Sequence, residues 1–434
     1  MSNAIGSATV EEKVTKVDSF NGIDIYKIHA EKFKTNSINI FFEDTLKREC
    51  VTKNALVPAV LRRGTQNLNT FRDIALYLEE LYGASFDCGV SKKGERQIIQ
   101  FYIDHISDKY TGEKSELLNK CFSLLFEIVT RPILEDGVFR ADYVDQEKEN
   151  LKKIIEGRIN DKMQYSVDRC LEETCKGEPF SIYEYGFIED LSAIDGKNLY
   201  EHYKDMLETF PMKVFVAGDI EDSALKSVTE KLKGLKRSNI KEQVTLPVQK
   251  KVDEVRNVTD ALDITQGKLS LGFRTNISSS DKAYYALLVY NSILGGGIHS
   301  KLFQNVREKE SLAYYSFSRL EKFKGLMVIS CGIEFQNKDK ALEIILEQLD
   351  EMKKGNISNY EFDASIKSIH TGLESLKDSQ MQMVDFFLSQ TVSGTSDTLS
   401  SLIEKVKKIS RQEIIDVAQG ITLDTVYFLT SQKG

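Results

Sequence analysis

Side chains that bind metals are few in this chain, and their spacing does not suit a helical metal site. The five histidines are His29, His105, His202, His299 and His370. No two of them lie three or four residues apart, so no two imidazoles can share one helical face and one metal ion. The six cysteines include no Cys-x-x-Cys pair, which argues against a zinc ribbon or a thioredoxin-like motif. These residue types therefore predict no metal site.

Nucleophilic catalysis has little support either. His299 and Ser300 are adjacent, but neighbouring residues on a helix do not face each other. No Gly-x-Ser-x-Gly elbow is present. Cys170 and Cys175 fall in a helical stretch and are expected to face a core. A stand-alone hydrolase is the weakest interpretation of the sequence.

Composition and charge limit the classes of partner. The chain has 58 Lys and Arg against 66 Asp and Glu, a net charge of −8, which disfavours binding to a phosphate backbone. No apolar run approaches the roughly 18 residues of a membrane span. Residues 1–13 lack the pattern of a signal peptide. We expect a soluble, cytoplasmic chain with reduced thiols that binds neither nucleic acid nor membrane.

The same order of elements occurs twice, with a displacement near 231 residues, the separation of Ile38 from Leu269. Each copy starts with an alternating strand, 38–42 or 269–273, which is expected to be half-buried. Two helices, a hairpin, an amphipathic helix, a long helix and a final apolar strand follow. The first copy is expected to place them at 51–62, 70–81, 85–104, 117–128, 141–174 and 214–217, and the second at 281–294, 300–309, 315–334, 342–352, 360–388 and 426–429.

This duplication predicts an α+β fold made of two homologous domains, 14–235 and 257–434, joined by a lysine-rich linker over 236–256. Runs of strands followed by runs of helices are typical of an antiparallel-rich sheet with helices packed on one face. Each half is long enough to bury its own core.

One segment of the second half is distinctive. It runs from Leu294 to Tyr314 and reads LGGGIHSKLFQNVREKESLAY. It closely resembles the carboxy-terminal-domain signature of the pitrilysin/insulinase family of zinc peptidases, which includes the mitochondrial processing peptidases. The resemblance extends to Gln266, to Tyr185-Gly186 and to the strand and turn over 214–219, and so covers the chain from about Ser19 onward. It implies the LuxS/processing-peptidase-like fold for both halves.

The resemblance implies catalytic roles for Arg307 and Tyr314, because in that family an Arg and a Tyr with this spacing complete the active site from across a cavity. A phenol O–H aimed at the carbonyl oxygen would stabilise the negative charge that peptide hydrolysis builds there. A guanidinium would hold peptide carbonyls in position. The glycine run Gly295, Gly296 and Gly297 is assigned to substrate binding. Without the resemblance, Arg307 is interpreted as a surface residue and Tyr314 as a core aromatic.

The family's zinc motif, His-x-x-Glu-His, is missing. Counting back from Gly64-Thr65 places Ala55, Pro58 and Ala59 at the His, Glu and His positions. None of these side chains binds zinc or accepts a proton, and Pro58 is expected to break the helix. Glu147 falls where the third ligand of the family sits, although farther from Ala59 than in the family pattern. We interpret Glu147 as a solvated side chain and expect no metal in this chain.

Together these features predict the zinc-lacking subunit of a bacterial heterodimeric metallopeptidase, inactive alone. Its expected partners are a homologous subunit that carries the zinc and an unfolded peptide, bound partly by strand addition. The alternative is a catalytically inert structural or interaction subunit, like the core relatives in respiratory complexes.

Overall fold

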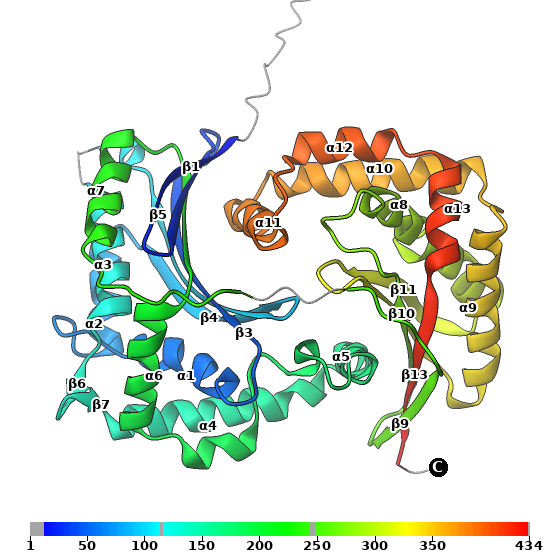
Figure 1. Cartoon of the computed structure of the whole chain (residues 1–434), viewed down its shortest axis with the longest axis horizontal. Helices are drawn as coiled ribbons and strands as arrows, with labels where there is room; N and C mark the ends of the chain where they lie inside the picture. Colours follow the sequence, from blue (N-terminus) through cyan, green and yellow to red (C-terminus); the bar gives the residue numbers. More distant parts are fainter. Residues whose placement is uncertain (1–12, 113–115, 244–247, 433–434) are drawn as a thin grey trace, which may run out of the picture.

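Two β-sheets, one from each half of the chain, organise the protein (Figure 1). The computed structural model describes residues 13–112, 116–243 and 248–432. The first sheet has the strand order β1-β2-β8-β3-β5-β4, and the second has the order β11-β12-β10-β13-β9. Only the pairs β2–β8 and β9–β13 are parallel within these two sheets. This architecture confirms the α+β fold with two similar, antiparallel-rich halves.

The first half contains its elements in the predicted order. They are β1 (Lys13–Phe20), β2 (Ile23–His29), β3 (Thr35–Thr45), α1 (Val51–Leu61), α2 (Phe71–Glu80), β4 (Ser85–Lys93), β5 (Arg96–Ile106), η1 (Asp108–Tyr110), α3 (Leu117–Thr130), the short strands β6 (Leu134–Glu135) and β7 (Val138–Phe139), α4 (Ala141–Gly157), α5 (Lys162–Thr174), α6 (Gly196–Thr209), β8 (Met212–Gly218) and α7 (Asp222–Lys233).

The second half repeats this order. Its elements are β9 (Arg256–Leu262), β10 (Gly267–Arg274), α8 (Tyr284–Gly295), the π-helix η5 (Phe303–Lys309), β11 (Ala313–Glu321), β12 (Leu326–Ile333), α9 (Lys338–Lys353), α10 (Asn359–Leu376), α11 (Gln380–Ser393), α12 (Leu399–Lys407), α13 (Arg411–Gly420) and β13 (Thr422–Ser431). Between α7 and β9 the described residues form no helix or strand. The predicted linker covers this stretch, and its residues 244–247 lie outside the described part of the chain.

Both predicted long helices are broken. The segment 141–174 divides at Arg158–Asn160 into α4 and α5, and the segment 360–388 divides near Ser379 into α10 and α11. Asp161 and Ser379 each accept a hydrogen bond from a backbone N–H of the next helix, so each second helix starts with its own cap. The sequence analysis missed these caps because the helical pattern continues across them.

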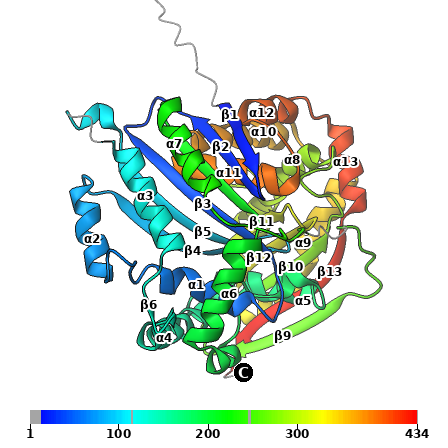
Figure 2. The ribbon, with the colours of Figure 1, turned by 60° about the vertical axis from the view of Figure 1, so that its left-hand side comes forward.

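The breaks allow the two halves to exchange helices. Helix α5, from the first half, packs on β10, β12 and β13 of the second sheet, and α11 packs on β3 and β8 of the first sheet. Val167 and Cys170 of α5 share a core with Val328 and Tyr427 of the second sheet. The exchange is visible in Figure 1 and from another direction in Figure 2. The two cores are therefore not independent, contrary to the estimate from length alone.

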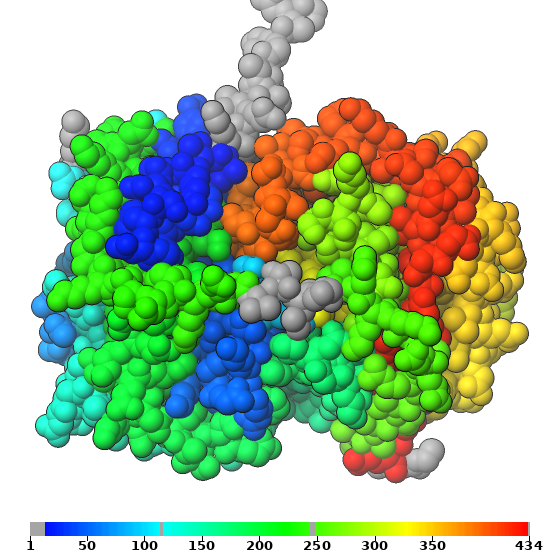
Figure 3. Space-filling model, viewed as in Figure 1, coloured from blue at the N-terminus to red at the C-terminus, as the bar shows by residue number. Residues whose placement is uncertain are grey.

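The central strands β3 and β10 are consequently buried on both faces. Every residue from Asn36 to Asp44 in β3, and all of β10, is buried. The prediction of half-buried strands was wrong, because the second face of each sheet is covered by a helix from the other half. Cys170 and Cys175 face this shared core, as predicted. On the molecular surface, the amino-terminal strands adjoin the orange helices of the second half (Figure 3).

Buried ion pairs join the tips of the two hairpins. Lys324, in the β11–β12 turn, pairs with Glu95 of the β4–β5 turn and with Glu178, 3.0 Å away. Arg274 is 1% exposed and joins Glu178 at 2.8 Å to Asp424 at 3.0 Å. These cationic partners lower the pKa of Glu178 to about 2, against the opposing effect of its burial. The network thus fixes one half against the other.

Candidate functional site

The predicted substrate-binding glycines occupy two different environments. Gly295 ends helix α8 and is buried, and a Cβ atom there would lie 2.3 Å from the backbone nitrogen of Ser318 in β11. Gly295 is therefore required for the close approach of α8 to β11. Gly296 and Gly297 are exposed and lead into Ile298, which is 68% exposed. Only these last residues of the loop are open to a ligand.

Arg307 projects from a π-helix. The wide turns are visible in the hydrogen bond from the Glu310 N–H to the Asn305 carbonyl, five residues earlier. Buried Val306 anchors this segment, while the Arg307 side chain is 43% exposed. Its guanidinium lies over the Phe303 ring, 4.7 Å from the centroid. The sequence predicted a regular helix here, and π-helical turns are typical of functional sites.

Tyr314 lies at the start of the edge strand β11, inside a β-bulge. The pairing of β11 with β12 shifts between Ala313 and Tyr315, so Tyr314 is the extra residue. Bulges redirect side chains, and Tyr314 is 62% exposed. The interpretation as a core aromatic was wrong for this residue. Its hydroxyl donates a hydrogen bond to Glu334 Oε1 at 2.7 Å, and this bond raises the pKa of Tyr314 and keeps the phenol protonated.

The degenerate zinc motif lies on helix α1, which is continuous. Pro58 is inside the helix, and the Arg62 N–H still donates to the Pro58 carbonyl at 3.2 Å. The prediction that Pro58 breaks the helix was wrong, because the buried apolar side chains of α1 hold the helix in place around it. Ala55 is 7% exposed and packed into the core.

Glu147 on α4 is not solvated, which corrects the interpretation from sequence. It is 7% exposed and forms an ion pair with Arg63. Asn150 donates to its other carboxylate oxygen at 3.1 Å. Arg63 follows Ala59 by one helical turn, and α1 packs on α4. The Arg63 guanidinium therefore neutralises Glu147, which faces α1 from α4.

A buried polar network that the sequence analysis missed fixes the start of α1. The side-chain amide nitrogen of Asn54 donates to Asp44 Oδ2 at 3.0 Å and to Gln97 Oε1 at 2.9 Å. The side-chain oxygen Oδ1 of Asn54 lies 2.7 Å from His202 Nε2. Burial lowers the pKa of His202 to about 4, so this imidazole is neutral. The residues come from β3, α1, β5 and α6, and no local pattern links them. The network positions the helix.

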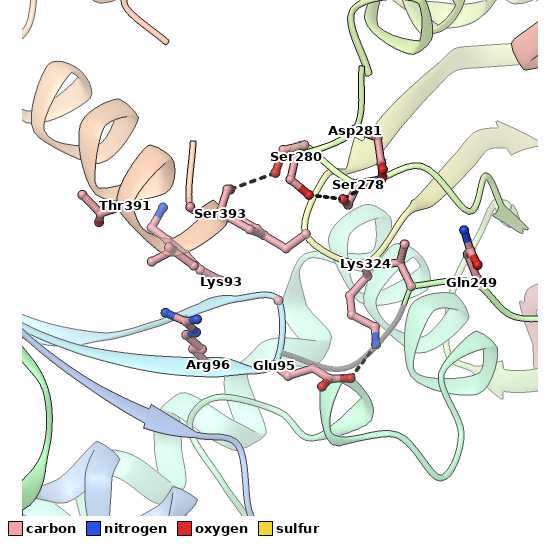
Figure 4. Close-up of a pocket in the computed structure, with 16 residues that line it drawn as sticks. Lys93, Glu95, Arg96, Gln249, Ser278, Ser280, Asp281, Lys324, Thr391 and Ser393 are labelled. Atoms are coloured by element: carbon pink, nitrogen blue, oxygen red, sulfur yellow. Dashed lines mark hydrogen bonds and ion pairs between the residues drawn. The ribbon is translucent and has the colours of Figure 1, made fainter. Parts of the chain in front are cut away.

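A cavity of about 550 Å³ lies between the halves (Figure 4). The β4–β5 turn, the loop over 278–281 and the end of α11 surround it. Its charged groups are paired within the protein: Lys324 with Glu95, Lys93 with Asp385 at 2.6 Å, and Arg96 with Glu43 at 2.8 Å. These paired groups therefore have a structural role between the two halves and offer little for catalysis.

Comparison with known proteins connects these observations. Residues 193–369 match a family model described as the peptidase M16 inactive domain. Over 413 residues, the chain is 36% identical to the probable inactive metalloprotease YmfF of Bacillus subtilis, covering 95% of this chain and 97% of that protein. The chain belongs to the M16 peptidase family. This is the pitrilysin-type family that the sequence resembles.

Further M16 relatives and solved structures agree. The uncharacterized zinc protease YmxG of Bacillus subtilis is 24% identical over 92% of this chain and 97% of its own length. A conserved protein from Enterococcus faecalis superimposes with a TM-score of 0.89 at 28% identity, over 98% of this chain and 99% of that one. A protease from Helicobacter pylori shares the fold, with a TM-score of 0.80 at 17% identity over 97% of this chain and 100% of that one. The matches to an inactive domain and to an inactive metalloprotease agree with the loss of the zinc motif from α1.

The described residues include no helix with the length and apolar character needed to cross a bilayer.

Proposed function

We propose that this M16 chain is the zinc-lacking subunit of a heterodimeric metallopeptidase, and that a homologous subunit supplies the zinc. The exposure of Arg307 and Tyr314 carries the proposal. Both side chains point outward from constrained backbone, a π-helix and a β-bulge, within the segment 294–314 that resembles the family's carboxy-terminal-domain signature. A chain that cannot hold the metal but presents a donor pair on its surface suits a shared active site.

In this arrangement Tyr314 donates its phenol O–H to the oxyanion that forms as the peptide bond is attacked, and it leaves Glu334 to do so. Arg307 holds the peptide carbonyls next to the scissile bond. The edge strand β11 offers unpaired backbone groups to an unfolded peptide, which is then bound by strand addition. The exposed residues 296–298 follow Gly295, which lies against Ser318 of this edge strand, and they form the rim of the substrate site.

We further propose a cytoplasmic location for the pair. All six cysteines are free thiols, four of them buried. A reducing compartment is where such a set of thiols persists.

The test is reconstitution with a homologous zinc-bearing M16 subunit, followed by peptide hydrolysis assays. Tyr314→Phe should lower kcat by about 10² to 10³ without lowering the affinity between the subunits. Tyr360→Phe is the matched control, because Tyr360 is 66% exposed on α10 and outside the signature. Unchanged turnover in the Tyr314→Phe pair would refute the catalytic role.

A second candidate function, an inert structural or interaction subunit, is favoured by one observation. Tyr314 and Arg307 already have local partners, Glu334 and the Phe303 ring. Affinity purification separates the two candidates. The heterodimer predicts a partner with the His-x-x-Glu-His motif, whereas an inert subunit predicts partners unrelated to peptidases.

A further inference from the structure

Three metal-ligating side chains meet at the ends of two parallel strands, away from helix α1. His29 is the last residue of β2, Glu31 follows in the next turn, and Asp219 follows the last residue of β8. Strands β2 and β8 are parallel neighbours with His29 opposite Gly218. The Ala30 N–H donates to the Gly218 carbonyl at 3.1 Å, which holds the two turns together. Backbone pairing thus gathers residues that lie 190 positions apart.

The ligand atoms have the separations that a metal site needs. One nitrogen of His29 and one carboxylate oxygen each of Glu31 and Asp219 all lie within 4.8 Å of one another. His29 Nε2 and Glu31 Oε1 are 3.0 Å apart. Two ligands on one tetrahedral zinc ion, with bonds of about 2.0–2.1 Å, stand roughly 3.3 Å apart.

A second observation comes from a neighbouring cavity of about 730 Å³, which meets the cluster at Asp219 and is also lined by Asn36 and Lys109, but not by His29 or Glu31. Asn36 is 5% exposed, and its carbonyl oxygen has no hydrogen-bond partner. That oxygen lies directly against Gly218, at 2.1 Å from where a Cβ atom would stand. A buried oxygen acceptor without a donor next to Asp219 favours a cation.

Lys109 now neutralises Asp219. Its ammonium group pairs with Asp219 Oδ2, but the Lys109 side chain is 66% exposed. A long side chain in solvent leaves such a pair at little cost. A metal ion can therefore replace the Lys109 ammonium group at Asp219.

We propose that His29, Glu31 and Asp219 bind a divalent transition-metal ion, with Zn²⁺ preferred to Mg²⁺. One neutral imidazole and two carboxylates balance the charge of such an ion, and an imidazole ligand selects against Mg²⁺. Bound there, the ion joins the ends of β2 and β8 and has no part in the peptide hydrolysis proposed for the heterodimer. The sequence analysis expected no metal because it considered only helical spacing, and Asp219 is far from His29 in the chain.

The test is isothermal titration of the full-length, metal-free protein with ZnCl₂ and, separately, with MgCl₂. We expect one Zn²⁺ per chain and no Mg²⁺ binding. His29→Asn and Asp219→Asn should each weaken Zn²⁺ binding by at least about tenfold. Glu31→Gln alters a side chain that is 60% exposed and provides a third variant that keeps the fold. Lys109→Gln should tighten binding, because it removes the competing ammonium.

His370→Asn is the matched control. His370 and Glu374 also form an exposed His–carboxylate pair, with atoms 4.0 Å apart, but no third ligand joins them among the residues that the structure describes. Zn²⁺ binding should be unchanged by this variant. The proposal is overturned if the protein binds no Zn²⁺, or if the affinity survives all three of His29→Asn, Glu31→Gln and Asp219→Asn.

Discussion

The regions around α1 and around α8–η5–β11 occupy equivalent places in the two halves, yet they differ in what they present. Near α1, Glu147 is buried and neutralised by Arg63. In the second half, Arg307 and Tyr314 point outward and have weak local partners. The first region thus contains an internal ion pair, whereas Arg307 and Tyr314 in the second region are open to solvent. The duplicated fold therefore has a buried ion pair in its first half and, at the equivalent place in its second half, an exposed surface suited to a shared active site.

The largest effect on stability is expected from breaking the ion pair between Arg63 and Glu147. Arg63→Ala should destabilise the protein by about 3 kcal/mol, because it leaves the buried Glu147 carboxylate without a cation. Chemical denaturation measures this difference. Arg62→Ala is the control, since Arg62 is 35% exposed and stands 3.5 Å from an exposed Asp87, and it should cost less than about 1 kcal/mol. Equal effects would mean that Glu147 does not depend on Arg63.

In the region around α8, η5 and β11, protein stability should depend most on Gly295. Gly295→Ala should destabilise by about 2 kcal/mol, because the added methyl group meets the backbone of β11. Gly372→Ala, on helix α10, meets nothing within 4 Å and should stabilise by about 0.5–1 kcal/mol. Thermal unfolding of the two variants should therefore shift in opposite directions. A neutral Gly295→Ala would show that α8 and β11 have room between them.

Acid should lower the stability of the folded protein through His202, which belongs to the buried network at the start of α1. Its pKa in the folded protein is lowered to about 4 by burial, while the unfolded chain has the ordinary value near 6.5. The unfolded state then binds the proton first, so stability is complete above about pH 6.5 and falls as the pH approaches 4. The loss from His202 between pH 7 and pH 4.5 should be about 2 kcal/mol. A His202→Gln variant should show a flatter dependence, and identical pH profiles would contradict this assignment.

The smallest effect concerns the rim of the open region. Ile298→Ser should weaken association with the zinc-bearing subunit by about 1 kcal/mol, or roughly fivefold in Kd, if this rim contacts the partner. Ile154→Ser is the control, because Ile154 is 48% exposed on α4 in the first half. Titration of the labelled partner gives both constants. Equal affinities for the two variants would place the interface elsewhere.

Much of the fold could be predicted from the sequence because its repeats are local. Alternation at Ile38 and Leu269, the glycine turns and the amphipathic helices each depend on neighbouring residues. The exchange of α5 and α11 could not be predicted, since it depends on caps at Asp161 and Ser379 inside continuous helical patterns. The sequence gives no sign that a strand is covered from the other half.

The candidate site was predictable only in part. The spacing of Arg307 and Tyr314 is evident from the printed sequence. So is the absence of His, Glu and His at Ala55, Pro58 and Ala59. The ion pair of Glu147 with Arg63 joins residues 84 positions apart, and the cluster at His29 joins more distant ones. Contacts of this kind depend on the packing of α1 on α4 and of β2 beside β8, which no local pattern encodes.

The most direct test of the divided chemistry is a peptide-hydrolysis assay of the purified chain, with and without the zinc-bearing subunit, and with and without a chelator. We expect chelator-sensitive hydrolysis only when both chains are present. Metal bound at His29 alone would leave this result unchanged. Chelator-sensitive hydrolysis by the isolated chain would contradict the account.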